Sequence, residues 1–278
     1  MIFEFFPPFT AEAETQLASA LEKLRPLSPS FVSVTYGAGG SPRDHTLRLV
    51  SSIRRDLGIE TMAHLTCVGS TRDEISKVLK QLSIEDIENV LCLRGDPPKG
   101  QSTFKQTPGG FKYASELTAF VRSRYEFCLG GACYPEGHVE SSDIDRDLEH
   151  LKLKVAAGAE FLITQLFFDS SLYFKFVERA RAINISLPII PGIMPVTNVD
   201  QLERFTSMCG ASIPTNLRER LNSVRNDPSA VRKVGVEYAT HQCVELLNGG
   251  APGIHFYTLN RSPSARAIFE NLRHRRLV

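Results

Sequence analysis

The strongest constraint on the fold is an eightfold alternation of short apolar segments, rich in β-branched and aromatic residues, with amphipathic helical segments. Parallel neighbouring strands need a helical crossover rather than a tight hairpin, so this alternation predicts an α/β protein with a parallel sheet. Eight units in 278 residues fit a (β/α)8 barrel that forms a single domain over residues 1–278. An open, doubly wound sheet is the alternative. The expected strand and helix pairs are 2–6 with 11–24, 31–37 with 43–57, 61–68 with 72–82, 89–95 with 114–124, 127–134 with 144–157, 161–168 with 171–183, 188–195 with a multi-part helical region 199–247, and 253–259 with 265–272.

Composition narrows the classes of function. The formal net charge is +1 and the one basic cluster is the short His274-Arg275-Arg276, so no nucleic-acid partner is expected. The apolar runs have the length of strands and are too short to span a membrane. The first residues lack the pattern of a signal peptide. The cysteines include no C-x-x-C pair, which favours reduced thiols in a cytoplasmic protein over a zinc site or a redox pair.

Polar residues gather near the C-terminal ends of the expected strands, which are otherwise apolar. In a barrel these ends meet at one rim, where barrel enzymes carry their chemistry. Any one of them could be a structural hydrogen-bonding group, and His64 alone is better explained as a core histidine. Their occurrence on six strands nevertheless predicts an active site at that rim. The residues are Thr35, Tyr36, His64, Thr66, Arg94, Gly95, Asp96, Tyr134, Glu136, His138, Thr164, Gln165, Tyr257, Asn260 and Arg261.

Glu4 is the most informative single residue. It lies within Ile2-Phe3-Glu4-Phe5-Phe6, where strand alternation makes both faces apolar. A carboxylate buried there is costly unless it is paired, and it tends to keep its proton. The sequence therefore predicts a raised pKa for Glu4, as a general acid near neutral pH requires. The structural alternative is an ion pair, for example with Arg94 or Arg261.

Asp96 ends the fourth expected strand, after Leu93-Arg94-Gly95. The glycine allows the backbone to approach a ligand closely. A strand-ending turn capped by the aspartate is the alternative. The segment 97–112 that follows is expected to be a long loop on the active-site side, either a mobile cover or an ordinary surface loop.

The fifth expected helix carries Asp143, Asp147, His150 and Lys154 on one face, which is either solvated or the wall of a nucleotide site. The sequence contains no G-x-G-x-x-G, no G-x-x-x-x-G-K-[ST] and no H-E-x-x-H motif. A bound dinucleotide is therefore expected to be held by the barrel rim rather than by a Rossmann unit or a P-loop.

Eight motifs spread over nearly the whole chain resemble those of methylenetetrahydrofolate reductases. They occur in the family's order, and together they are highly specific. The chain length is similar to that of the short bacterial form, without the C-terminal regulatory domain of the eukaryotic enzymes. The motifs are Phe3-Glu4-Phe5-Phe6-Pro7-Pro8, Val32-Ser33-Val34-Thr35-Tyr36-Gly37, His64-Leu65-Thr66-Cys67, Leu93-Arg94-Gly95-Asp96, Tyr134-Pro135-Glu136, Thr164-Gln165, Pro191-Gly192-Ile193-Met194-Pro195 and His255-Phe256-Tyr257-Thr258-Leu259-Asn260-Arg261.

The resemblance implies a ping-pong flavoprotein oxidoreductase. NAD(P)H reduces FAD and leaves, and 5,10-methylenetetrahydrofolate then accepts the hydride to give 5-methyltetrahydrofolate. Glu4 corresponds to the family's general acid, and Asp96 to a catalytic carboxylate near the flavin and the folate. The implied folate contacts are Glu4, Gln165, Gln201, Phe205, Tyr257 and Arg261, with Phe205 used by both substrates. The implied FAD-binding positions are Thr35, His64, Leu93, Arg94, Gly95, Asp96, Ala132, Tyr134, His138, Asp147, His150 and Lys154.

Two residues depart from the family pattern on the fifth helix. His150 stands where an asparagine is common and Leu153 where an arginine is common. Loss of an arginine removes a charge-assisted bond of roughly 1.5–3 kcal/mol, so FAD is expected to bind more loosely, with Lys154 as a partial substitute.

The identity of the hydride donor and two other functions stay open. NADH is favoured over NADPH, because the sequence has no obvious basic cluster for a 2′-phosphate. The family resemblance also implies a homo-oligomer. The alternatives are a pterin-binding barrel methyltransferase without redox chemistry, a flavin-independent reductase, and a catalytically silent folate- or flavin-binding protein.

Overall fold

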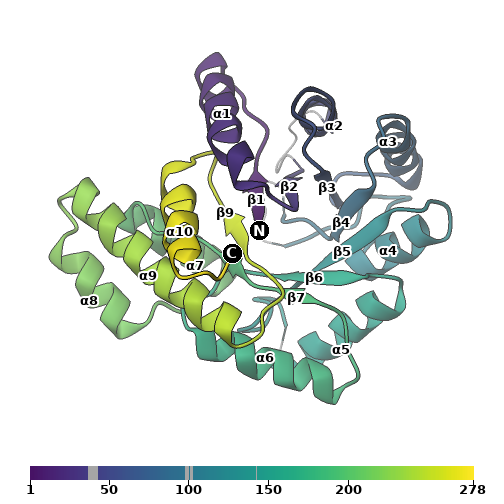
Figure 1. Ribbon diagram of the computed structural model, residues 1–278. Helices are drawn as coiled ribbons and strands as arrows, with labels where there is room; N and C mark the ends of the chain where they lie inside the picture. Colours follow the sequence, from purple (N-terminus) through teal and green to yellow (C-terminus); the bar gives the residue numbers. More distant parts are fainter. Residues whose placement is uncertain (37–42, 98–99, 101–102, 142) are drawn as a thin grey trace.

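The computed structural model describes residues 1–36, 43–97, 100, 103–141 and 143–278. Over these residues the strands form one parallel sheet in the order β7-β6-β5-β4-β3-β2-β1-β9-β8, encircled by helices (Figure 1). The strands are β1 (Ile2–Phe5), β2 (Phe31–Val34), β3 (Thr61–Thr66), β4 (Asn89–Leu93), β5 (Cys128–Cys133), β6 (Phe161–Thr164), β7 (Ile189–Ile190), β8 (Gly192–Ile193) and β9 (His255–Tyr257).

The sheet closes through one short segment of chain. β7 pairs with β6, whereas β8, which follows after Pro191, pairs with β9, so the expected seventh strand joins the two edges. A Cβ on Gly192 would lie 2.4 Å from the carbonyl oxygen of Thr164, and the Gly192 amide donates to Thr164 Oγ1 at 2.9 Å. The barrel prediction is confirmed, and the open doubly wound sheet is wrong.

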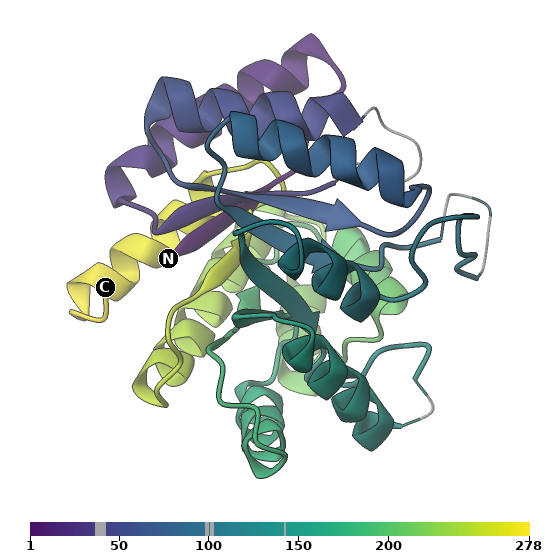
Figure 2. The same ribbon diagram turned by 90° about the vertical axis from the view of Figure 1, so that its right-hand side faces the viewer.

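Helices follow the strands in the expected order and cover the outside of the sheet (Figures 1 and 2). Many begin at a residue whose side chain accepts from the first turn, including Thr10, Thr71 and Asn198. No helix within the described ranges is long and apolar enough to cross a membrane. The helices are α1 (Ala11–Leu24), η1 (Arg25–Leu27), α2 (Arg43–Ser52), the π-helical η2 (Ile53–Leu57), α3 (Arg72–Ile84), α4 (Ala114–Arg122), α5 (Ile144–Ala156), α6 (Ser170–Ala182), α7 (Val199–Cys209), α8 (Thr215–Ser223), α9 (Pro228–Asn248) and α10 (Pro263–His274).

The core has an outer and an inner part. The large outer cluster packs one face of the strands against the helices and includes Phe3, Phe5 and Phe256. A small cluster of Met62, Leu91 and Ile163 packs separately from it. Because side chains alternate along a strand, Met62 shares the inner face with His64, and Glu4 lies opposite Phe3 and Phe5. The strands therefore direct Glu4 and His64 into the barrel.

Candidate functional site

Glu4 lies in a cluster of polar side chains inside the barrel. Its carboxylate Oε2 is 3.1 Å from Nε2 of His255 and 3.6 Å from Nε2 of His64. Ser33 Oγ is 2.6 Å from the same His64 nitrogen. These groups come from β1, β9, β3 and β2, and parallel register aligns β1 with both β2 and β9. The Glu4 side chain is 17% exposed, whereas His255 is fully buried.

The cluster corrects the expected ionisation of Glu4. Burial raises its pKa, but the hydrogen bond donated by His255 and the attractions of His64 and His255 outweigh burial and lower the pKa below its ordinary value. The prediction of a raised pKa is therefore wrong for the ligand-free protein. The alternative pairing with Arg94 or Arg261 is wrong too, because the carboxylate's partners are histidines.

The two histidines are held in different ways. Burial lowers the pKa of His64 to about 4, although Glu4 opposes that shift, so its ring is neutral at pH 7. Nε2 of His255 faces Glu4, and its buried Nδ1 has no hydrogen-bond partner within the described chain. With the proton on Nε2, the unpartnered atom is a bare acceptor, which leaves no buried N–H unsatisfied. His255 was missed as a site residue; its place two residues before Tyr257 on one strand face was the available signal.

A cavity of about 630 Å³ lies beside β4 and β5, between α4 and α5. Its volume is within the range of ordinary cofactor sites. It brings together two thirds of the predicted FAD-binding positions, from strand ends and from one face of α5. They are Leu93, Arg94, Ala132, Tyr134, His138, Asp147, His150 and Lys154.

Charged groups in this cavity are partly paired. Arg94 donates to both carboxylate oxygens of Glu140, at 2.6 and 2.7 Å. Lys154 donates from Nζ to the carbonyl oxygen of Ala132. Burial lowers the pKa of Lys154 and raises that of Asp147. Asp147 and Lys154 on α5 are half-buried in the cavity wall, whereas His150 beside them is exposed and Asp143 lies outside the lining.

Four predicted FAD-binding positions do not line the cavity. His64 lies in the Glu4 cluster, and the Thr35 amide donates to the carbonyl of Phe5 at 2.9 Å. Gly95 has a φ of +84°, a conformation that favours glycine, and exposed Asp96 follows it. Asp96 acts electrostatically on the neighbouring Tyr134, whose pKa is raised chiefly by burial and further by that carboxylate.

Two cations that the sequence analysis missed also line this cavity. Lys112 Nζ lies 5.1 Å from the ring centroid of Tyr113, and Arg146 projects from the first turn of α5. Arg146 forms no ion pair with any residue that the structure describes. Leu153, 59% exposed, lies on the same wall. Arg146 therefore offers a charge on the helix where the expected arginine is replaced by leucine.

A second cavity of about 340 Å³ opens beside β9, α7 and α1. It brings together Gln201, Phe205, Tyr257 and Arg261, four of the predicted folate contacts. The Tyr257 hydroxyl donates to the carbonyl of Thr164 at 2.7 Å, and its pKa is raised well above the ordinary value, chiefly by burial.

Gln165 and Glu4 are outside the lining of both cavities. The side-chain oxygen Oε1 of Gln165 accepts from the backbone amide of Leu166 at 2.8 Å. The side-chain nitrogen Nε2 of Gln165 has no protein partner among the described residues. A polar ligand that reaches β6 would find this NH2 group free.

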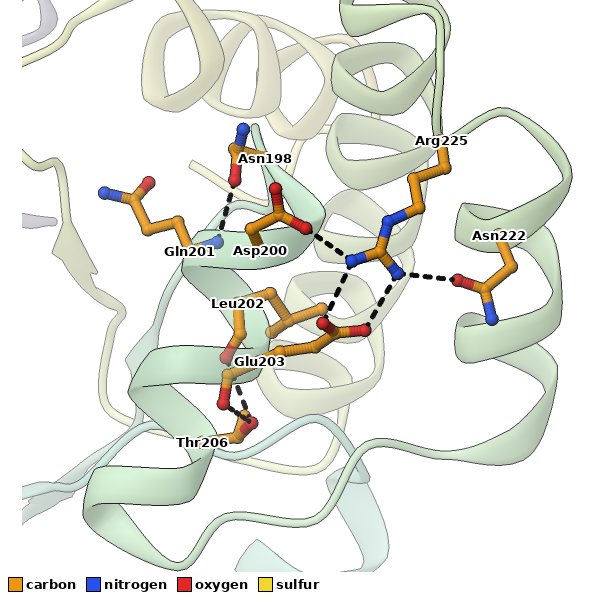
Figure 3. Close-up of polar contacts among 8 residues, drawn as sticks. All are labelled: Asn198, Asp200, Gln201, Leu202, Glu203, Thr206, Asn222 and Arg225. Carbon is orange, nitrogen blue, oxygen red and sulfur yellow. Dashed lines mark hydrogen bonds and ion pairs between the residues drawn. The ribbon is translucent and has the colours of Figure 1, made fainter.

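Arg225 links α7 to the segment that follows α8 (Figure 3). The guanidinium, which follows α8, bonds both carboxylate oxygens of Glu203 at 3.1 Å and also Asp200. These bonds raise the pKa of Arg225 further. Figure 3 shows the Gln201 side chain pointing away from Arg225, and Gln201 lines the second cavity. The ion pairs of Arg225 therefore lie on the side of α7 that faces away from Gln201.

Two further features lie apart from the Glu4 cluster. A further cavity, of about 1080 Å³, lies between α1, α2, η2 and α3, and its lining includes none of the predicted site residues. Of the loop 97–112, residues 98–99 and 101–102 fall outside the described residues, as do Gly37-Ala38-Gly39-Gly40 and Ser41-Pro42. Phe104 of this loop contacts Arg94, whose guanidinium carbon is 5.0 Å from the ring centroid.

A closed parallel barrel with polar cavities at the C-terminal ends of its strands is the architecture of (β/α)8-barrel enzymes. The family model for methylenetetrahydrofolate reductase matches residues 1–273, and the chain belongs to that family. It is 37% identical over 270 residues to the 5,10-methylenetetrahydrofolate reductase of Salmonella typhimurium, covering 97% of this chain and 89% of the relative.

Longer relatives and a solved structure extend the comparison. The chain is 40% identical over 281 residues to methylenetetrahydrofolate reductase (NADH) 1 of Arabidopsis thaliana, covering 97% of this chain but 48% of the relative, so it spans about half of that protein. An uncharacterized protein from Clostridium thermocellum that binds two copies of 5-methyl-5,6,7,8-tetrahydrofolic acid has the same fold, with a TM-score of 0.61, 18% identity and coverage of 99% and 94% of the two chains.

Proposed function

We propose that this chain reduces 5,10-methylenetetrahydrofolate to 5-methyltetrahydrofolate, with FAD as cofactor and NADH or NADPH as hydride donor. The observation that carries the proposal is the mostly buried Glu4 carboxylate, 3.1 Å from His255, on the strand that adjoins Tyr257 of the second cavity. Family membership supports the reaction and the substrate. The name of the Arabidopsis relative supports NADH as the donor.

The cavity beside β4 and β5 suits FAD by its chemistry. Arg146, Lys112 and His138 place nitrogen donors and positive charge along its wall, as a diphosphate requires. Ala132, Leu93 and Tyr134 supply apolar surface and backbone groups for a ring system. Bound FAD would supply hydride transfer between the nicotinamide and the folate. Asp96, at the strand end beside this cavity, would disfavour negative charge on a reduced flavin.

Glu4 would deliver the proton that opens the folate's five-membered ring. In the ligand-free protein its lowered pKa leaves it ionised at neutral pH, so it must first gain a proton. Burial is the largest influence on this pKa and acts upward. A folate that covers the remaining exposed part of Glu4 would increase this effect, and the carboxyl group would then hold a proton to transfer.

The second cavity would receive the folate. Phe205 and Tyr257 offer aromatic surface, and Gln201 and Arg261 offer hydrogen-bond donors. The free NH2 group of Gln165 suits a carbonyl oxygen of the pterin ring.

The absorbance of the purified protein tests the proposal. A flavin band that bleaches anaerobically with NADH and returns on addition of methylenetetrahydrofolate is the expected result. A purified protein that remains inactive after FAD is added would contradict the proposed flavin-dependent reaction. A methyltransferase without redox chemistry would bind folate yet never oxidise NADH, and a flavin-independent reductase would consume NADH without a flavin band.

We further propose that residues 1–278 act as one catalytic unit in the cytoplasm and associate into a homo-oligomer. All six cysteines are free thiols, as expected in a reducing compartment. Light scattering during gel filtration measures the oligomeric state.

A further inference from the structure

A fourth cavity, of about 310 Å³, adjoins the candidate folate cavity. It lies where α1, α9 and the start of α10 meet. The two cavities share part of their lining, so a ligand can extend from one into the other. The shared residues are Gln16, Thr197, Asn260, Arg261 and Ser264.

The lining of this cavity is positively charged. Lys23 comes from α1, Arg232 from α9 and Arg261 from the segment before α10. Within the described part of the chain, no carboxylate lines the cavity. None of these three cations forms an ion pair with any residue that the structure describes, whereas Arg225 and Arg220 nearby in the chain are paired with carboxylates. Like charges that face one cavity without partners favour an anionic ligand.

The start of α10 adds unused hydrogen-bond donors. Ser262 is its N-cap but makes no capping bond, and the first turn contains no acidic residue. Ser262 and Ser264 are only 4% and 8% exposed and line the cavity, and their hydroxyls have no partner within the described chain. A helix N-terminus carries partial positive charge, so free hydroxyls that face the cavity beside it suit a carboxylate. These donors are independent of the three cations and indicate the same ligand chemistry.

We propose that this cavity binds the anionic tail of the folate substrate, with carboxylates of γ-linked glutamates beyond the first facing Lys23, Arg232 and the start of α10. The inference rests on the proposed function, which puts the folate in the adjoining cavity. Arg261 lies in both cavities and marks the point where the aryl part of the folate meets the tail. The 2′-phosphate of NADPH is the rival anion.

Binding of product to the FAD-loaded enzyme tests the tail site. Flavin fluorescence is titrated with 5-methyltetrahydrofolate carrying either one or five glutamates. The pentaglutamate is expected to bind about tenfold more tightly at low salt, an advantage that shrinks as sodium chloride is raised to 0.5 M. Lys23→Gln and Arg232→Gln should each reduce this advantage about two- to fivefold.

Lys233→Gln is the matched control. Lys233 is exposed, directly follows Arg232 on α9 and is outside the lining of this cavity, so its loss changes net charge equally and should keep the pentaglutamate advantage. Equal binding of both folates by the wild type, or equal effects of all three substitutions, would overturn the tail site while leaving the proposed function standing. Variants that bind NADPH more weakly relative to NADH, with an unchanged ratio of pentaglutamate to monoglutamate affinity, would assign the cavity to the 2′-phosphate. Absence of binding by either folate would remove both proposals.

Discussion

His255 Nε2 lies 3.1 Å from the Glu4 carboxylate, although the two residues are 251 positions apart in the chain. The pairing depends on the sheet topology, because β9, the last strand in the chain, lies in parallel register beside β1, the first. The carboxylate is therefore held ionised by a residue from the last strand.

Glu4→Gln should separate the two half-reactions. The amide keeps the size of the side chain but cannot donate an acidic proton, so flavin reduction by NADH should stay largely intact while folate reduction falls at least about 100-fold. Anaerobic stopped-flow absorbance measures both steps. Equal impairment of the two would show that Glu4 has a structural role instead.

Replacement of His255 should move the pH dependence of folate reduction. The hydrogen bond from His255 lowers the pKa of Glu4, so His255→Leu should raise that pKa. A general acid is active below its pKa, and the loss of activity at high pH should therefore begin at higher pH in the variant. His255→Gln retains a hydrogen-bond donor, so its pH profile of folate reduction should stay closer to that of the wild type. An unshifted profile in His255→Leu would contradict the coupling.

His64 should make stability sensitive to mild acid. Its pKa is about 4 in the folded protein against an ordinary value of 6.5, so the unfolded chain binds more protons between these values. The stability that depends on a neutral His64 is fully present above pH 6.5 and is lost as the pH falls toward 4. From pH 7 to pH 5 the loss is about 2 kcal/mol.

Urea unfolding at pH 7 and pH 5 measures this difference. His64→Gln should abolish it, whereas His241→Gln, at an exposed position on α9, should keep it. The same loss in both variants would contradict the assignment to His64.

Arg146 should contribute to FAD affinity. It lines the cavity beside β4 and β5 without an ion-pair partner in the described chain, so Arg146→Gln should weaken FAD binding about tenfold. Lys152→Gln, on the same helix but outside the lining, is the matched control. Leu153→Arg should strengthen binding, and a fluorescence titration in which it changes nothing would remove the reason for expecting loose FAD binding.

Gly192→Ala should destabilise the barrel. The added Cβ would lie 2.4 Å from the Thr164 carbonyl oxygen at the point where the sheet closes, a clash that costs about 1–3 kcal/mol. Gly253→Ala is the control, because its Cβ would meet nothing within 4 Å. Thermal unfolding of the two variants should differ by several degrees, and equal melting temperatures would argue against steric closure at Gly192.

Most of the fold was predictable because it depends on local periodicity. The helix expected over 11–24 is α1 with the same bounds, and the helical region 199–247 is α7, α8 and α9. The division of the expected strand 188–195 into β7 and β8 was not predictable, because it depends on which edge each half meets.

The sequence by itself determined the parallel barrel, the rim where the polar residues meet, and the burial of Glu4, since each follows from spacing along the chain. Only the tertiary structure decided the direction of the Glu4 pKa shift. Burial alone raises that pKa, and the opposing hydrogen bond comes from His255, which barrel closure brings to the first strand. In the same way, Lys23, Arg232 and Arg261 are scattered in the chain and become one basic cavity only when α1, α9 and α10 pack together.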